Sequence, residues 1–214
     1  MISLSLDGQT ADVPLALVAD LKADLDITDS SSDLRLERLL LTASSMVLAY
    51  IGRPILSGEW TEEFRLIPSE RTEEIVLGVV PVTEIKTVSH NGTGWSAGQV
   101  EDLILDKRAG LLSLPSKPYH FWRPGLYSIT FQAGYVPPSV DENNQAQPGT
   151  LPRVISQAAL MTASSLWASG DRDPLLKSET VQGVGSTTWN SAAGTGGMPQ
   201  SAADLLASFR NGLM

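Results

Sequence analysis

Apolar residues recur at helical spacing in the first quarter of the chain. Across residues 29–54 they return every three or four positions, which draws one apolar stripe along about five turns of helix. Ser30 can accept hydrogen bonds from the first free backbone N–H groups, and Asp33 faces the positive end of the helix dipole. Gly52 can adopt the left-handed conformation that ends a helix. The pattern therefore predicts a helix over residues 30–51, on which the rest of the chain packs.

The same helix carries a second set of apolar positions. Leu34, Leu41 and Leu48 lie outside the main stripe and follow one another at seven-residue spacing. Two interpretations remain open: the helix is buried on two sides within its own domain, or the second face is an assembly interface between subunits. A shorter helix is predicted before it, over residues 14–25, with a proline in its first turn.

The hydrophobic period changes from helical to alternating after Pro54. β-branched and aromatic residues alternate with polar ones, which is typical of antiparallel strands. Turn-forming residues at 90–94 and 107–110 predict two hairpin tips. A further short strand at residues 2–6 is either an edge strand or a loose arm. The predicted strands after Pro54 span residues 59–66, 74–77, 82–89, 103–106, 111–114 and 126–133.

The last third of the chain alternates between polar loops and helical segments. Residues 136–150 are polar and aperiodic, and they are predicted to form a surface loop. Helical spacing resumes over residues 152–169, and this helix is expected to pack against the long N-terminal helix. Residues 179–190 are compatible with a strand, residues 191–198 form a Gly-rich connector, and residues 201–211 form a terminal helix.

These elements predict an α+β fold: a helical bundle with an inserted antiparallel β region and an extended C-terminal arm. The Gly-rich connector has few side chains to bury, so we expect a partner to supply contacts for the terminal helix; the alternative is that this helix folds back onto its own subunit. The side chains predicted to make the assembly contact are Leu205, Leu206, Phe209 and Arg210. The predicted parts are residues 1–54 (N-terminal strand and helical hairpin of the bundle), 55–135 (β region), 136–150 (loop), 151–173 (bundle helix) and 174–214 (C-terminal assembly arm).

The charge of the chain narrows the function classes. Fifteen Lys and Arg residues against 24 Asp and Glu residues give a formal net charge of −9, which argues against affinity for nucleic acid or anionic lipid. The first 33 residues hold seven Asp and one basic residue, Lys22. The absence of cysteine excludes a disulfide framework and a thiolate nucleophile. No apolar run approaches the roughly 18 residues that span a bilayer, and a signal-peptide pattern is missing, so we expect a soluble protein made in a cytoplasm, with no membrane partner.

The residues needed for catalysis or metal binding do not come together in this sequence. The only histidines are His90 and His120, too few for a metal-ligand cluster or a Ser-His-Asp set. Adjacent carboxylates on a strand point to opposite faces and do not converge on a substrate. We therefore expect no enzyme activity and no cofactor or metal site. Three tryptophans of the β region form either a sugar-binding platform or part of its core: Trp60, Trp95 and Trp122.

Several short segments follow one another in a characteristic order. The long helix ends in Tyr-Ile-Gly-Arg-Pro at 50–54, and a strand then reads Pro-Val-Thr-Glu-Ile at 81–85. A later strand ends in Ala-Gly-Tyr at 133–135, and the next helix begins with Leu-Pro-Arg-Val-Ile at 151–155. With these segments in this order, residues 14–173 resemble the head-tail connector (head-completion or adaptor) proteins of tailed bacteriophages and prophages. The N-terminal strand and the Gly-rich passage before the last helix depart from that family.

The resemblance implies a structural virion protein, made in the host bacterial cytoplasm, that forms a ring under the portal at the capsid–tail junction. The ring is usually twelvefold in this family, with the portal protein on one side and a tail-side neck or tail-terminator protein on the other. DNA passes through it without specific binding, and an acidic lumen would avoid tight binding of phosphate. Two alternatives are a tail-completion protein and a monomeric carbohydrate-binding or hydrolytic β domain. The residues predicted to face the lumen are Asp20, Asp24 and Asp26.

Overall fold

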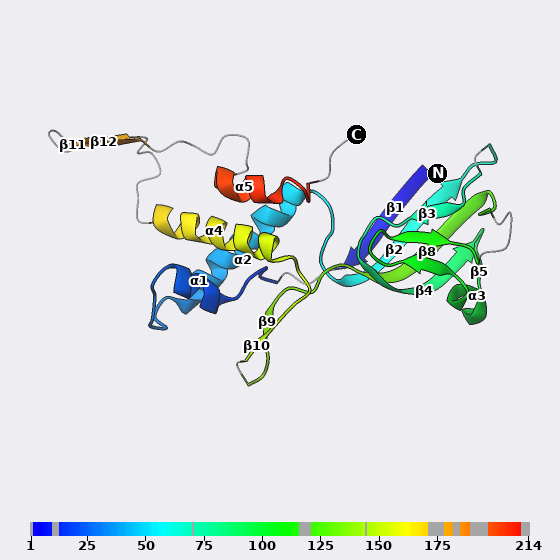
Figure 1. Cartoon of the computed structure of the whole chain (residues 1–214), viewed down its shortest axis with the longest axis horizontal. Helices are drawn as coiled ribbons and strands as arrows, with labels where there is room; N and C mark the ends of the chain where they lie inside the picture. The colour runs from blue at the N-terminus through cyan, green and yellow to red at the C-terminus, as the bar shows by residue number, and fades with distance from the viewer. Residues whose placement is uncertain are drawn as a thin grey trace. The chain divides into compact units, whose positions relative to one another are not determined.

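The chain has a mixed α+β fold that divides into two compact units (Figure 1). The β unit comprises Met1–Ala11 and Pro54–Val136, and the helical unit comprises Asp12–Arg53 and Pro137–Met214. The structure, a computed structural model, describes residues 2–9, 13–69, 71–115, 121–143, 145–170, 178–181, 185–188 and 197–210.

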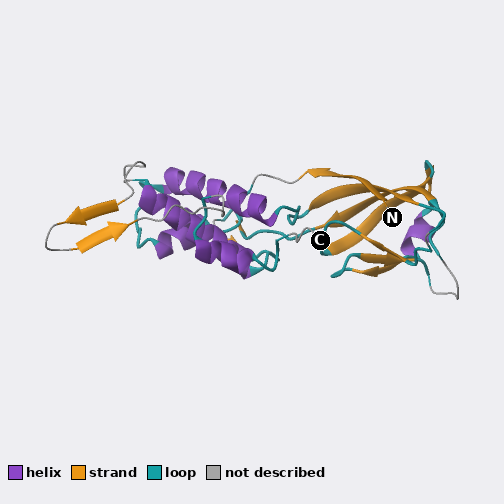
Figure 2. Ribbon diagram, turned by 90° about the horizontal axis from the view of Figure 1, so that it is seen from above, coloured by secondary structure: helices purple, strands orange, loops and turns teal. Residues whose placement is uncertain are grey.

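Several helices lie side by side in the helical unit (Figure 2). Helices α2 and α4 form its centre, and they pack against each other as their apolar spacing predicted (Figure 1). The buried face of α4 consists largely of small side chains, which allows the two helices to approach closely. Helix α1 packs against both of them, and α5 packs against α4. None of the described helices is both long enough and apolar enough to cross a membrane. The bounds are Val18–Asp24 for α1, Asp33–Ile51 for α2, Arg153–Ser169 for α4 and Gln200–Leu206 for α5.

Helix α2 begins later than predicted and ends where predicted. Its N-cap residue is Ser32, whose side chain makes no capping hydrogen bond, so the predicted cap at Ser30 is wrong. The Asp33 carboxylate instead accepts a hydrogen bond from Lys22 Nζ at 2.7 Å, which ties the start of α2 to α1. At the other end, Gly52 has a φ of 70° and donates its N–H to the carbonyl of Leu48 at 3.1 Å. This left-handed residue ends the helix, as its sequence position indicated.

Helix α1 also starts later than predicted, at Val18 and not at Pro14. The preceding segment is held in a non-helical conformation by a buried contact with α2. The backbone N–H of Leu15 donates to Ser44 Oγ at 2.9 Å, and the Leu15 side chain is completely buried. Leu17 has an extended backbone, with φ −84° and ψ 144°, and is the N-cap, so the helix begins after it at Val18.

The β unit contains two antiparallel sheets, where the sequence suggested one region. The larger sheet has the strand order β1-β2-β8-β4-β5 and the smaller one the order β3-β7-β6. Their buried faces share one apolar cluster, to which Phe64 and Ile129 contribute from the larger sheet and Ile75 and Leu112 from the smaller. The larger sheet consists of β1 (Ile2–Gln9), β2 (Gly58–Leu66), β8 (Gly125–Ala133), β4 (Val82–His90) and β5 (Thr93–Gly94). The smaller consists of β3 (Glu74–Val76), β7 (Leu111–Ser113) and β6 (Ile104–Asp106).

Strand β1 belongs to the β unit, so the prediction that grouped residues 1–54 with the helical bundle is wrong at its N-terminal end. β1 pairs along β2 as an edge strand of the larger sheet, with Asp7 opposite Thr61 and Gly8 opposite Trp60. The predicted hairpin tips at 90–94 and 107–110 do connect β4 with β5 and β6 with β7. The interpretation of residues 2–6 as an edge strand is confirmed. Its partner strand could not be predicted from local alternation, and for that reason the strand was grouped with the wrong unit.

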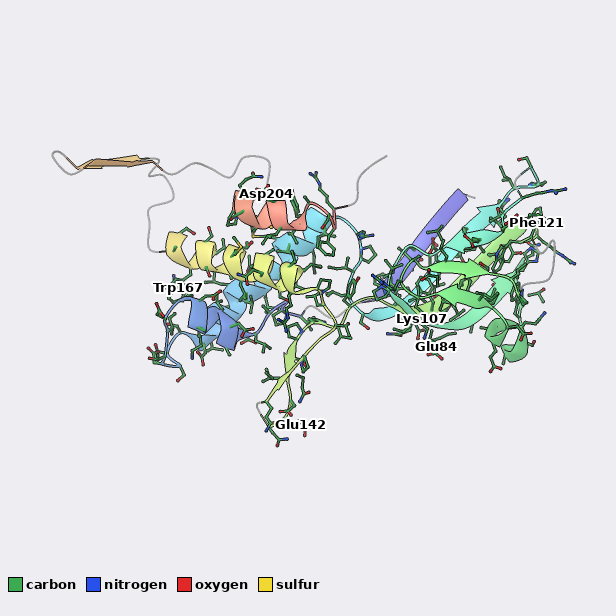
Figure 3. The ribbon with its side chains drawn as sticks, viewed as in Figure 1. Glu84, Lys107, Phe121, Glu142, Trp167 and Asp204 are labelled. Carbon is green, nitrogen blue, oxygen red and sulfur yellow. The ribbon has the colours of Figure 1, made fainter. Side chains whose placement is uncertain are left out.

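Two short elements were not predicted. Helix α3 (Ala97–Glu101) has a capping box, in which Ser96 and Gln99 satisfy each other's backbone N–H groups. The segment predicted as a loop at 136–150 contains a hairpin of β9 (Ser139–Val140) and β10 (Ala146–Gln147). At its tip, the Asp141 carboxylate accepts backbone N–H groups of Asn143 and Gln145, and these bonds lower the pKa of Asp141. Figure 3 shows Glu142 at this same tip, in the helical unit.

The C-terminal part differs from the predicted extended arm. The strand predicted at residues 179–190 is a two-stranded hairpin of β11 (Ser178–Val181) and β12 (Gly185–Thr188). Residues 191–196 of the predicted Gly-rich connector lie outside the described residues. Helix α5 then folds back onto α4, and Met198 and Leu206 are completely buried in the helical unit. The alternative weighed for this helix, that it joins its own subunit, is therefore the correct one.

Candidate assembly surfaces

The tryptophans of the β unit are core residues and form no exposed platform. Trp60 and Trp122 are buried, and Trp95 stacks on Trp122 with ring centroids 5.6 Å apart. The His90 ring stacks on Tyr127 at 4.5 Å, and His120 lies outside the described residues. In the part of the chain that the structure describes, no group of three or more His, Asp or Glu residues could hold a metal ion. The carbohydrate-binding alternative thus loses the exposed aromatic surface on which it depended.

Glu62 is a carboxylate inside the core of the β unit. It is 5% exposed, and its Oε2 accepts the backbone N–H of Gly78 at 2.8 Å. Burial raises the pKa of the Glu62 carboxyl, and the hydrogen bond from Gly78 opposes that rise in part. The contact ties β2 to the chain before β4, so the role of Glu62 is structural.

Helix α2 presents an outer stripe on the side away from its buried face. Successive residues of a helix are turned by about 100° about its axis. Four residues therefore lie more than roughly 100° around the helix from the centre of the buried stripe: Leu34, Arg38, Leu41 and Ser45. Leu34 is 76% exposed and Leu41 is half-buried. Leu48, the third leucine of the predicted interface, is half-buried at the flank of this stripe. Burial of all three leucines within their own domain is excluded, because Leu34 faces solvent.

Charged residues flank the leucines of the outer stripe. Glu37 lies on one side of Leu34 and Leu41 around the helix, and Arg38 lies on the other. Both charged residues are exposed, and neither has a salt-bridge partner among the described residues. The Arg38 Nε donates to the carbonyl of Leu34 at 3.3 Å, which leaves the other guanidinium N–H groups available. The outer stripe is therefore an apolar line between opposite charges.

A groove of about 520 Å³ lies on the helical unit between α1, the start of α4 and the chain around the β9–β10 hairpin. Its apolar lining comes from Pro138, Pro148, Leu151, Leu160 and Ala23. Asp20 and Asp24 line it from α1, and Arg153 lines it from the first turn of α4. These three charged side chains have no salt-bridge partner within the described ranges. The groove thus combines an apolar lining with carboxylates on one element and a guanidinium on another.

The three aspartates predicted to face a DNA channel do not form one set. Asp20 and Asp24 are four residues apart on α1 and both line the groove, whereas Asp26 is not among its lining residues. Asp26 follows α1 with a φ of 56° and is exposed. The structure therefore brings two of the predicted carboxylates together and separates the third.

The predicted C-terminal contact residues also divide. Leu206 is completely buried in its own helical unit and is unavailable to a partner, so its assignment to an assembly interface is wrong. Leu205 is 38% exposed and Phe209 is half-buried. The Arg210 guanidinium lies over the Tyr50 ring at 5.1 Å, which attaches the end of the chain's last helix to α2. Of the four residues, Leu205 is the most exposed apolar one.

A similar contact fixes the start of α2 to the end of α4. The guanidinium of Arg35 lies 4.5 Å from the ring of Trp167, which Figure 3 labels on α4. Arg35 is therefore occupied within its own subunit, and Arg38, one turn further, is the more available guanidinium on α2. Glu37, Arg38 and Arg153 were not predicted, because the helical spacing of apolar residues does not indicate which charged side chains border an exposed apolar line. The groove could not be predicted from the sequence, because the residues that line it from α1 are more than a hundred positions away from the others.

Comparison with known proteins gives a family match and similar solved structures. The model of the family described as "Head completion protein" matches residues 15–212. A chain in the neck of an empty gene transfer agent particle, computed with C6 symmetry, is 18% identical, with a TM-score of 0.52 over 97% of this chain and 95% of that chain. Chains in the C12-symmetric neck of the native particle and in its virion are 17% identical, with the same TM-score and coverage. These likenesses concern the fold. No curated protein matches the sequence.

Proposed function

Because this chain belongs to the head completion protein family, and is thus a structural protein of the virion's head–tail junction, we propose that it forms a homo-oligomeric ring that docks on the portal protein. The ring has twelve copies and offers its other side to a tail-side neck or tail-terminator protein. The observation that carries the proposal is the family match over residues 15–212. The fold shared with chains of C6- and C12-symmetric necks supports the ring.

The surface of the helical unit is suited to a closed ring. Head-to-tail contacts around a ring need two different patches on each subunit, one for each neighbour. The outer stripe of α2 and the groove beside α1 are two such patches, and each leaves apolar side chains and unpaired charges at the surface. Burying the 76% exposed side chain of Leu34 at a subunit interface would remove apolar surface from water and so favour assembly.

The charge of the chain fits a channel through which DNA slides. A net charge of −9 disfavours binding of phosphates, so DNA passing through the ring would not be retained. Asp26 is the retained candidate for a lumen-facing carboxylate, because it is exposed and lies outside the groove. Structural support of the junction needs no chemical step, which agrees with a role without enzyme activity.

The test is assembly with the portal protein of the same virion. The purified chain is mixed with portal rings, and the complex is measured by mass photometry and imaged by cryo-electron microscopy. We expect a complex with twelve copies of this chain on one side of the portal and an open channel. The assembled complex should not retain duplex DNA at low salt. A chain that stays monomeric and leaves the mass of the portal unchanged would contradict the proposal.

A further inference from the structure

We infer that the outer stripe of α2 on one copy docks into the groove beside α1 on the next copy. Leu34 and Leu41 then contact the apolar lining, Arg38 meets Asp20 and Asp24, and Glu37 meets Arg153. The inference rests on the proposed ring and names the contact that closes it. It assigns roles to five charged residues that the family match leaves without one.

The charge pattern argues for this pairing. The stripe has an apolar line with a carboxylate on one side and a guanidinium on the other, while the groove has an apolar lining with two carboxylates on α1 and a guanidinium on α4. Docking the stripe with Arg38 toward α1 places opposite charges together on both sides. The reverse orientation would place Glu37 beside Asp20 and Asp24, so charge also selects the direction of docking.

The spacing of the two patches is also compatible. Asp20 and Asp24 are four residues apart on α1, so their Cα atoms lie about 6 Å apart along that helix. A guanidinium has five N–H donors in a planar fork and can bond two carboxylates at this separation. The contact is the helix-in-groove mode, with exposed leucines as anchors.

A second copy is the occupant that the structure favours over other proteins. The stripe cannot fill the groove of its own subunit, because no residue of α2 lines that groove. Each patch is the complement of the other, so a single contact repeated around the ring satisfies both. This arrangement is the heterologous contact that a cyclic assembly requires. A portal or tail segment in the groove would leave the charges of the stripe unpaired.

Charge reversal tests the pairing. Arg38→Glu places a carboxylate beside Asp20 and Asp24, and Asp24→Lys places an ammonium beside Arg38; each single change should raise the concentration needed for ring assembly about 10- to 100-fold. The combination Arg38→Glu with Asp24→Lys should recover most of that loss. Asp24 is the last residue of α1, where a positive charge favours the helix dipole, so the lysine does not unfold α1. Arg108→Glu, an exposed change in the β6–β7 turn, is the matched control and should assemble like the parent.

Cross-linking tests the contact without changing charge. The chain has no cysteine, so Leu34→Cys and Pro148→Cys introduce the only thiols. When the two single variants are mixed with portal and oxidised, we expect a disulfide between a Leu34→Cys copy and a Pro148→Cys copy. A pair with one cysteine at Ile104 of the β unit, an exposed residue outside both patches, is the control and should not cross-link.

The outcomes separate the docking inference from the proposed ring. If the parent forms rings and Arg38→Glu and Asp24→Lys also form them at the same concentration, the docking is wrong while the ring stands. If Asp24→Lys prevents joining to portal or tail but leaves rings intact, another protein occupies the groove and the inference is overturned. If the double reversal recovers nothing, the assigned charge pair is wrong. If the parent itself forms no ring, both proposals fail together.

Discussion

Ile155→Ala should lower the stability of the helical unit by an amount that the structure sets. Ile155 is completely buried in α4, in the same face as Ala158 and Ala159. The change removes three carbon atoms, worth about 0.8 kcal/mol each in transfer free energy. The cavity left between close-packed helices adds to this loss, so the free energy of unfolding should fall by about 3 kcal/mol, within the range of about 2–5 kcal/mol for such changes.

The neighbouring residue provides the matched control. Val154 precedes Ile155 on α4 and is 40% exposed, so Val154→Ala should change the free energy of unfolding by less than about 0.5 kcal/mol. Met46 of α2 is only half-buried, so Met46→Ala should lower the free energy of unfolding by less than Ile155→Ala does.

Urea unfolding followed by far-UV circular dichroism measures these changes, because the signal comes mainly from the helical unit. For a domain near 100 residues, a loss of 3 kcal/mol lowers the Tm by about 12–24 °C. If Ile155→Ala and Val154→Ala have the same midpoint as the parent, α4 does not pack on α2 through this face. The reasoning from burial to stability would then be refuted for the centre of the helical unit.

Three further predictions concern other parts of the chain. The pKa of Glu62 in the folded protein lies above its usual 4.5, so the folded protein binds more protons than the unfolded chain. Stability therefore falls as the pH rises from about 4.5 through the folded pKa. Thermal unfolding across pH should show a smaller fall for Glu62→Gln and an unchanged fall for the outward-facing Glu63→Gln. Gly134→Ala should destabilise the β unit, because the φ of Gly134 is 103° and an added Cβ would lie 2.2 Å from the carbonyl oxygen of Leu56. An added Cβ at Gly98, in helix α3, meets open space, so Gly98→Ala should stabilise the β unit by about 0.5–1 kcal/mol. Truncation after Asn190 removes α5 and should lower the Tm of the helical unit and raise its protease sensitivity; an unchanged Tm would contradict the packing of α5 on α4.

The sequence predicts those elements whose formation depends on their own pattern. The long apolar stripe located α2, and the glycine that ends it at position 52 fixed the C-terminal boundary through a local backbone requirement. Alternation located β2, β4 and β8 within one residue of their ends. The short helix α3 was missed because five residues are too few to show a helical period, although its Ser96 and Gln99 form a capping box.

Errors arose where a distant segment decides the local structure. The start of α1 was misplaced because Leu15 is buried and bonded to Ser44 of α2, a contact with a distant segment that helical spacing does not show. The C-terminal helix was predicted to leave its subunit because its Gly-rich connector suggested reach, yet the buried Leu206 packs in the helical unit. Apolar side chains on a short helix indicate that one face of it is buried, but they do not indicate which segment covers that face. For the same reason, the sequence placed Asp20 and Asp24 on a helix but did not predict the groove that they line.

The path of the chain has a consequence for how this subunit bears load. The chain passes between the two units three times, after Ala11, after Arg53 and after Val136. A force that acts between the units is therefore divided among three stretches of backbone, and a single protease cut leaves two covalent connections. The same path delays folding, because α2 is complete at Ile51 whereas its partner α4 begins only at Arg153. A ribosome must finish the β unit before the helical unit can close, so a chain that stops before Arg153 lacks the partner on which α2 packs.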